Sequence, residues 1–213
     1  MNGDSLLLVT DVQYDFLPGG ALAVPRGDEV VTVINRLAAK FANVILTQDW
    51  HPPGHVSFAS SHAGRRPFET IDLPYGAQVL WPDHCVQGSR GAEFAATLAV
   101  AHAQAVIRKG YHAHTDSYSA LLEADRVTPT GLAGLLRERG IRRVYCCGLA
   151  TDFCVAWSAL DAQAAGFETW VVEDACRAID TGGSLAAARR ELAAAGVRMT
   201  SSDTLQAHAL PYG

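Results

Sequence analysis

The sequence lacks long apolar runs and has no excess of positive charge. No stretch of its 213 residues approaches the roughly 20 consecutive apolar residues that a membrane-spanning helix requires. The first residues are polar and acidic, which is unlike the start of a signal peptide. The formal net charge of −5 gives no electrostatic reason to expect a nucleic-acid partner. We therefore predict neither a membrane protein nor a nucleic-acid-binding protein.

Cysteine is scarce and its count is odd. Five cysteines without a regular spacing indicate reduced thiols and a cytoplasmic location rather than a disulfide framework. Cys146 and Cys147 lie in a predicted strand and are interpreted as small buried hydrophobic residues, an interpretation also favoured for Cys85 and Cys176. With 49% hydrophobic and 18% charged residues, the composition is typical of a globular protein. The length fits one domain over residues 1–213.

Short apolar runs alternate with amphipathic stretches along the chain. The predicted strands cover residues 5–11, 43–48, 105–109, 143–148, 168–172 and 197–201. The predicted helices cover residues 28–41, 90–101, 129–139, 151–166 and 184–196. Residues 49–88 are rich in Pro, Gly, Ser and His and are predicted to form a long loop of the kind that often carries function. The alternation predicts an α/β fold with three α/β/α layers around a six-stranded, mostly parallel sheet.

Reactive side chains follow the predicted strands, at the edge where ligands bind on such sheets. Asp11, Asp49 and Lys109 end three strands, and Cys154 lies beyond a fourth. A thiol near a helix start and beside a lysine is expected to have a lowered pKa. Asp11 is a candidate to take the thiol proton and return it to a leaving amine. The simpler interpretation is a buried cysteine, a capping aspartate and a surface lysine.

The long predicted loop contains a candidate metal site. Asp49 and His51 lie two residues apart, on one side of an extended chain, and His84 follows at the far end of the loop. Two histidines and a carboxylate suit Zn²⁺ or Fe²⁺ with positions left for water or substrate. The alternative is a histidine-rich surface loop, because His55 and His62 lie there too.

Five sequence blocks, in this order and spacing, carry a resemblance to known proteins. They are DVQYDFLPGGALAVPRGDEV at 11–30, TQDWHPPGHVSFASSH at 47–62, LWPDHCVQGSRGAEF at 80–94, KGYHAHTDSYSAL at 109–121 and CGLATDFCVAWSALDA at 147–162. On these blocks the chain resembles the nicotinamidases (pyrazinamidases) of the isochorismatase-like cysteine hydrolase superfamily, over nearly its whole length. The resemblance implies that fold and the hydrolysis of nicotinamide to nicotinate and ammonia, through a cysteine thioester, in NAD salvage.

The resemblance also implies roles for particular residues. The family's catalytic triad falls on Asp11, Lys109 and Cys154. An oxyanion hole is implied at the backbone amides of Ala150 and Cys154, after a non-proline cis peptide bond between Leu149 and Ala150. The implied substrate-binding residues, which include aromatic rings that sandwich a planar ligand, are Phe16, Leu22, Trp81, Tyr118 and Leu149.

The implied cofactor is one divalent ion, Zn²⁺ or Fe²⁺, with Mn²⁺ as a further option. Its ligands fall on Asp49, His51 and His84. A further ligand position falls on Ser57, with His55 as the alternative left open. The loop over residues 110–114 has fewer acidic residues than relatives often carry there, which leaves the rim of the pocket in question.

Two other functions stay open at this stage. One is a related cysteine amidohydrolase acting on a carbamoyl or ureido compound, although such relatives generally lack the Asp-x-His plus His set. The other is a non-catalytic metal- or ligand-binding protein on the same fold. An isochorismatase is disfavoured by the presence of Cys154. We expect a small-molecule substrate and a homo-oligomer.

Overall fold

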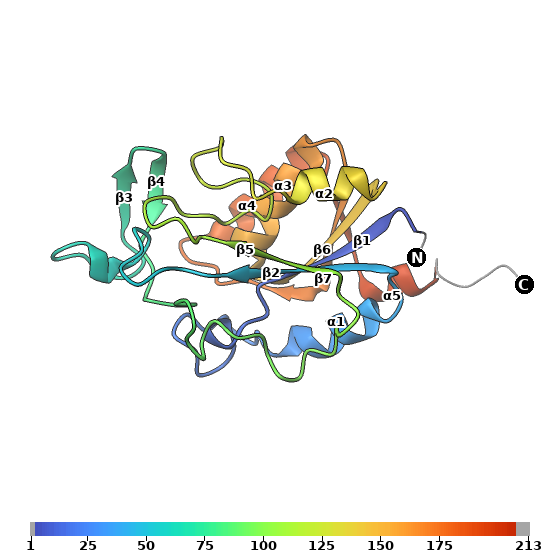
Figure 1. The fold of residues 1–213 in the computed structure, drawn as a ribbon, viewed down its shortest axis with the longest axis horizontal. Helices are drawn as coiled ribbons and strands as arrows, with labels where there is room; N and C mark the ends of the chain where they lie inside the picture. Colours follow the sequence, from blue (N-terminus) through green and yellow to red (C-terminus); the bar gives the residue numbers. More distant parts are fainter. Residues whose placement is uncertain (1–2, 208–213) are drawn as a thin grey trace, which may run out of the picture.

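The main element of the structure is a six-stranded sheet. A computed structural model describes residues 3–207 of the chain (Figure 1). All six strands are parallel, in the order β5-β2-β1-β6-β7-β8. Their bounds are β1 Ser5–Thr10, β2 Asn43–Asp49, β5 Ala105–Lys109, β6 Arg143–Leu149, β7 Glu168–Arg177 and β8 Arg198–Thr200. The predicted six-stranded sheet is confirmed.

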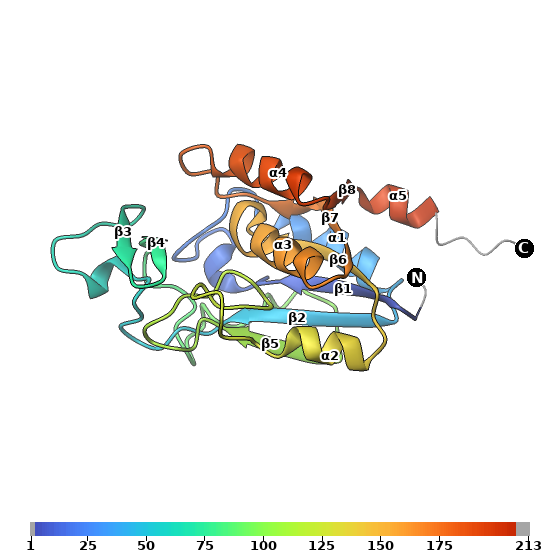
Figure 2. The same cartoon turned by 90° about the horizontal axis from the view of Figure 1, so that it is seen from above.

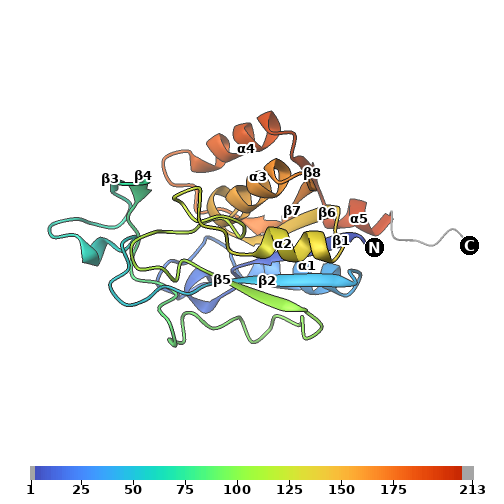
Figure 3. The same cartoon turned by 45° about the horizontal axis from the view of Figure 1, so that its top comes forward.

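Helices cover both faces of this sheet, as the alternating pattern predicted. Their bounds are α1 Glu29–Ala38, α2 Leu132–Glu138, α3 Ala156–Ala164, α4 Ser184–Ala194 and α5 Ser202–Ala207. Helix α1 lies on one face, and α2, α3 and α4 lie on the other (Figures 1 and 3). Strand β1 is buried along its whole length, as expected for a parallel strand covered on both sides. Within residues 3–207, no helix combines the length and apolar character needed to cross a membrane.

The strand order creates a topological switch between β1 and β6. From β1 the chain builds outward to β2 and β5, then crosses back to build β6, β7 and β8 on the other side (Figure 2). Ligands on open parallel sheets bind beyond the carboxyl ends of the strands at such a switch. The two central strands approach closely at Gly148, where φ is +111° and a Cβ would lie 2.1 Å from the Thr10 carbonyl oxygen. Glycine is therefore required at the base of the site.

Several predicted elements differ from the structure. The loop predicted over 49–88 contains a projecting antiparallel hairpin, β3 Thr70–Leu73 and β4 Gly76–Val79 (Figure 1). The helix predicted over 90–101 is wrong. The Asn35 side chain donates to the Thr97 carbonyl and accepts from the Ala99 N–H, which takes backbone groups that a helix would use.

The ends of other elements were also misplaced. Helix α2 begins at Leu132 rather than at Pro129, because Gly131 adopts a left-handed conformation before it. Strand β7 continues to Arg177, beyond the predicted end at residue 172, and α5 was not predicted. The extension of β7 matters for the site, because it brings the segment before α4 to the carboxyl edge of the sheet.

Candidate active site

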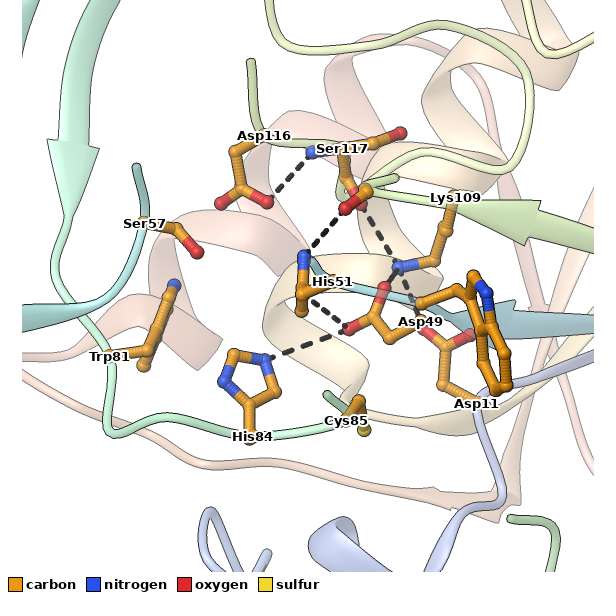
Figure 4. Close-up of polar contacts among 12 residues, drawn as sticks. Asp11, Asp49, His51, Ser57, Trp81, His84, Cys85, Lys109, Asp116 and Ser117 are labelled. Atoms are coloured by element: carbon orange, nitrogen blue, oxygen red, sulfur yellow. Dashed lines mark hydrogen bonds and ion pairs between the residues drawn. The ribbon is translucent and has the colours of Figure 1, made fainter. Parts of the chain in front are cut away.

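Lys109 stands at the centre of a buried polar cluster at the carboxyl edge of the sheet. Its side chain is fully buried at the end of β5. The ammonium Nζ lies 2.9 Å from Asp11 Oδ2, 3.3 Å from Cys154 Sγ, and donates to a carboxylate oxygen of Asp49 and to the Ser117 carbonyl (Figure 4). The structure therefore brings the predicted Asp11, Lys109 and Cys154 into one cluster.

Asp11 is held in an uncommon backbone conformation at the end of β1. Its φ is +48°, in the left-handed region that non-glycine residues rarely adopt. The Thr47 hydroxyl accepts a hydrogen bond from the Asp11 N–H and donates one to Asp11 Oδ1 at 2.5 Å. Among the described residues, Oδ2 receives no well-directed hydrogen bond, although the Lys109 ammonium is near. One carboxylate oxygen is therefore committed to Thr47, and the other remains available for a proton.

The titration of this cluster differs from the sequence prediction. We predicted a lowered pKa for the Cys154 thiol, but burial raises that pKa well above its usual value, and Asp11 and Asp49 add to the effect despite the opposing charge of Lys109. Burial also raises the pKa of Asp11, against the charge of Lys109. Desolvation outweighs the lysine here. The structure thus favours a protonated resting thiol beside a carboxyl group that binds protons readily.

Asp49, His51 and His84 converge beside this cluster (Figure 4). Their ligand atoms all lie within 4.8 Å of one another, and Asp49 Oδ2 lies 3.6 Å from His51 Nε2 and 3.8 Å from His84 Nε2. The other ring nitrogens lie 2.8 Å from backbone carbonyls, His51 Nδ1 from that of Gly110 and His84 Nδ1 from that of Pro82. A carbonyl accepts only from N–H, so Nδ1 of each ring is the donor, and each Nε2 is directed at Asp49.

The charges of this group suit a cation. Burial opposes ionisation of Asp49, but the charge of Lys109 and hydrogen bonds from His51 and His84 hold its pKa well below the usual value. Burial opposes protonation of His51, but its hydrogen bond with Asp49 and the charge of that residue raise its pKa. Two imidazole nitrogens and an ionised carboxylate form a donor set for a divalent ion, so the residues fit the predicted metal.

The two candidates for a further ligand, Ser57 and His55, are fully buried and bonded to each other. His55 Nδ1 lies 2.7 Å from Ser57 Oγ, and His55 Nε2 lies 3.1 Å from the His112 carbonyl. Burial and the nearby charge of His51 lower the pKa of His55 to about 4. A neutral His55 therefore donates a hydrogen bond from Nε2 to the His112 carbonyl and accepts one at Nδ1 from the Ser57 hydroxyl. Both of its ring nitrogens are occupied, whereas the Ser57 oxygen keeps lone pairs.

A cleft opens beside these two groups. It is lined by Phe16, Leu22, Asp49, His51, Trp81, His84, Asp116, Tyr118, Ala150, Phe153, Cys154 and Ile179. Four of the predicted substrate-binding side chains are among them, but Leu149 is not, because it is buried in the core at the end of β6. The Trp81 ring is edge-on to Phe153 at 4.9 Å and donates a hydrogen bond to the Tyr118 hydroxyl. Aromatic rings thus set the shape of the cleft.

Three lining residues were not predicted from the sequence. Phe153 lies inside the block that contains Cys154, so that block contained a signal for it. Asp116 lies in the polar loop after β5, and its carboxylate accepts hydrogen bonds from Gln78 Nε2 and the Ser117 N–H. Ile179 comes from the segment between β7 and α4, and no motif marks it.

Cys154 lies in a turn of π-helix, Thr151–Val155, that leads into α3. The peptide bond between Leu149 and Ala150, immediately before this turn, is cis, as the resemblance implied. Ala150 and Cys154 both line the cleft. The other four cysteines are buried and free, and Cys146 and Cys147 are core residues of β6, as predicted.

Comparisons with known proteins give one consistent result. Residues 5–204 match the isochorismatase domain. The chain is 57% identical over 196 residues to a nicotinamidase of Acinetobacter baylyi, covering 92% of each chain. Among solved structures, it is similar to a nicotinamidase/pyrazinamidase of Acinetobacter baumanii, with a TM-score of 0.96, 56% identity and coverage of 96% of this chain and 99% of that one.

Two further solved structures were determined with small ligands. A PnC1 protein from L. infantum in complex with nicotinate has a TM-score of 0.83 and 40% identity, with 95% of this chain and 96% of that one covered. A pyrazinamidase of Pyrococcus horikoshii in complex with zinc has a TM-score of 0.76 and 35% identity, with 93% and 99% covered.

Proposed function

The chain belongs to the isochorismatase domain family, and on that premise we propose that it is an amide hydrolase that converts nicotinamide to nicotinate and ammonia. Its relatives at 57% and 44% identity are nicotinamidases, and a similar structure holds nicotinate. The observation that carries the mechanism is the cluster in which Lys109 Nζ lies 3.3 Å from Cys154 Sγ and 2.9 Å from Asp11 Oδ2, at a cleft with aromatic walls.

In the first half of the reaction Cys154 is the nucleophile. Asp11 takes the thiol proton as sulfur attacks the carboxamide carbon, which forms the C–S bond and moves one electron pair onto the amide oxygen. The resulting tetrahedral oxyanion accepts hydrogen bonds from the amides of Ala150 and Cys154, and loss of one such donor typically costs about 10²–10³ in rate. Asp11 then protonates the nitrogen as the C–N bond breaks, which releases ammonia and leaves a thioester.

In the second half water replaces ammonia. Asp11, again ionised, removes a proton from water as its oxygen attacks the thioester carbon. The new tetrahedral oxyanion collapses with cleavage of the C–S bond, and the proton returns from Asp11 to the sulfur. The carboxylic acid that forms loses its remaining proton to solvent and leaves as nicotinate. The raised pKa values of Asp11 and Cys154 suit this exchange, because both groups bind the same proton readily. Lys109 keeps both carboxylates paired and is not itself acylated.

The remaining lining residues orient the substrate. Phe16, Trp81 and Tyr118 enclose the planar ring, and the carboxamide then lies beside Cys154. Asp49, His51 and His84 would hold a divalent cation, which would supply a Lewis acid for the ring nitrogen. We assign Ser57 rather than His55 as the further ligand, direct or through water, because both His55 nitrogens are already hydrogen-bonded.

The choice between functions rests on the metal-binding residues. A carbamoyl or ureido substrate has no ring nitrogen for a cation to bind, so the convergence of Asp49, His51 and His84 beside the thiol favours nicotinamide. A non-catalytic binding protein has no need for Asp11 and Lys109 next to a buried thiol. A role in NAD salvage, a cytoplasmic location and a homo-oligomer remain predictions from the sequence.

Ammonia release tests the function directly. The protein, loaded with Zn²⁺ or Fe²⁺, is expected to release ammonia from nicotinamide much faster than from ureido or carbamoyl compounds, and chelator is expected to weaken the reaction. Cys154→Ala is expected to abolish release while nicotinamide still binds. Cys176→Ala, which removes a buried thiol outside the cleft, is the matched control. Turnover retained by Cys154→Ala would remove Cys154 from the mechanism.

A further inference from the structure

Ile179 lines the cleft but is neither a proposed catalytic residue nor a proposed metal ligand. It is half-buried and lines the same cleft as Cys154 and Phe153. It comes from residues 178–183, an irregular segment between β7 and α4. The next residue, Asp180, has a φ of +52°, which non-glycine residues adopt only where neighbouring contacts hold them.

The contact that holds this segment is the side chain of Asp152. Asp152 is 5% exposed, and its carboxylate accepts three hydrogen bonds. The donors are the N–H of Ile179 at 3.1 Å, the N–H of Asp180 at 2.8 Å and the Ser184 hydroxyl at 2.5 Å. Hydrogen bonds to a charged acceptor are stronger than neutral ones. Within residues 3–207, all the hydrogen bonds that this carboxylate accepts come from the segment that ends at Ser184, the first residue of α4.

Asp152 also belongs to the turn that carries the nucleophile. It lies in the π-helical turn Thr151–Val155, two residues before Cys154. The next two residues after Asp152, Phe153 and Cys154, line the cleft. Figure 2 shows α4 alongside α3, the helix that follows this turn. One carboxylate therefore joins the nucleophile turn to the Ile179 wall of the cleft.

We propose that Asp152 is a positioning residue that fixes Ile179 as a specificity-determining wall, so that the cleft accepts an unsubstituted aromatic amide ring and rejects ring-methylated forms. The inference rests on the proposed function for the identity of the ring. Asp152 does not line the cleft, so it acts through Ile179. A rigid wall is required for this selection, because a mobile isoleucine would move aside for an added methyl group.

The size of the expected effect follows from the volume involved. One methylene group in an apolar pocket changes kcat/KM about 10- to 200-fold. Ile179→Ala removes most of the side chain. For at least one of the four ring-methylated nicotinamides, it is expected to raise kcat/KM relative to that of nicotinamide about 10-fold or more. Asp152→Asn is expected to change the same ratio in the same direction by a smaller factor, because the wall is loosened rather than removed.

A matched control exists on β7. Asp174 accepts hydrogen bonds from the N–H and hydroxyl of Ser202 at the start of α5. It therefore binds the start of a helix as Asp152 does, but away from the cleft. Asp174→Asn is expected to leave every substrate ratio unchanged. Ser184→Ala removes one of the three donors to Asp152 and supplies a milder variant if Asp152→Asn fails to fold. Hydrogen exchange at the amides of Ile179 and Asp180 is expected to accelerate in Asp152→Asn and not in Asp174→Asn.

Three results would overturn the inference. Unchanged ratios for all four methyl isomers in Ile179→Ala would exclude Ile179 as a specificity wall. Equal changes in Asp152→Asn and Asp174→Asn, or no change in both Asp152→Asn and Ser184→Ala, would exclude a specific role for Asp152. Selectivity is also measured as the ratio of dissociation constants in the Cys154→Ala background, with nicotinamide and its methyl isomers as probes. Binding needs no turnover, so absent hydrolysis would reject the proposed function alone.

Discussion

Replacing Lys109 with methionine tests the balance of charges in the buried cluster. The substitution keeps an unbranched apolar chain but removes the ammonium that contacts Asp11, Asp49 and Cys154. Removing one partner of a buried ion pair typically costs about 3–5 kcal/mol. The carboxyl group of Asp11 has an alternative to remaining charged, which is to take up a proton.

Proton uptake limits the cost and makes it depend on pH. The usual pKa of an aspartate is 3.8, and each pH unit above it makes protonation about 1.4 kcal/mol more costly. At pH 7 the variant is therefore expected to lose about 4 kcal/mol, and at pH 4 less than about 1 kcal/mol. The sign follows from burial, which raises the folded pKa of Asp11. The folded variant binds more protons than the unfolded chain, so stability is lost as pH rises from 4 to 7.

Urea denaturation of metal-free protein in chelator, at pH steps from 4 to 7, measures this difference against the unchanged protein. Arg108→Met is the matched control, because Arg108 is the neighbouring residue on β5 but is exposed, over the Trp50 ring. It is expected to cost about 1 kcal/mol or less at every pH. An equal loss of stability by Lys109→Met at pH 4 and pH 7, or a loss as small as that of Arg108→Met, would refute the reasoning.

Two further substitutions probe the base of the site and the metal group. Gly148→Ala is expected to lower the free energy of unfolding by roughly 2–4 kcal/mol, because of the positive φ and the contact with Thr10. The control is Gly134→Ala in α2, where a Cβ meets open space, and it is expected to raise the free energy of unfolding by about 0.5–1 kcal/mol. Chemical denaturation measures both variants. His51→Ala is expected to lose the bound metal and to raise KM for nicotinamide. The control His102→Ala, at an exposed site away from the cleft, is expected to keep the metal and the original KM. Metal analysis and kinetics measure both variants, and normal metal content in His51→Ala would contradict the assignment.

The strands and the residues at their ends were predictable because the signals are local. A run such as SLLLVT in β1 is long enough for a strand and too apolar for a surface loop, and parallel strands expose their carboxyl ends at one edge. The positions of Asp11, Asp49 and Lys109 follow from that rule once the strands are known. Cys154 required the resemblance, because a cysteine near a helix start is usually a buried hydrophobic residue.

Other features depend on contacts between distant segments, which the sequence does not reveal. The apolar pattern over 90–101 fits a helix, but Asn35 of α1 binds the backbone of that segment. Ile179 reaches the cleft only because β7 is longer than its apolar run indicates and because Asp152 holds the segment that follows. The pKa of Cys154 was predicted in the wrong direction, because the sequence shows the nearby lysine but not the complete burial of the cluster.

That burial explains why the proposed reaction needs both Asp11 and Lys109. A dry site penalises every charge, so a thiolate beside two carboxylates and one ammonium is disfavoured, and the proton stays on sulfur until attack begins. Asp11 is a suitable acceptor at that moment because the same burial raises its own pKa. The charge of Lys109 opposes the protonation of Asp11, and a protonated Asp11 would be no base. Removing the ammonium is therefore expected to stop thiol activation even where the fold survives, and removing the carboxylate leaves the thiol proton with no acceptor.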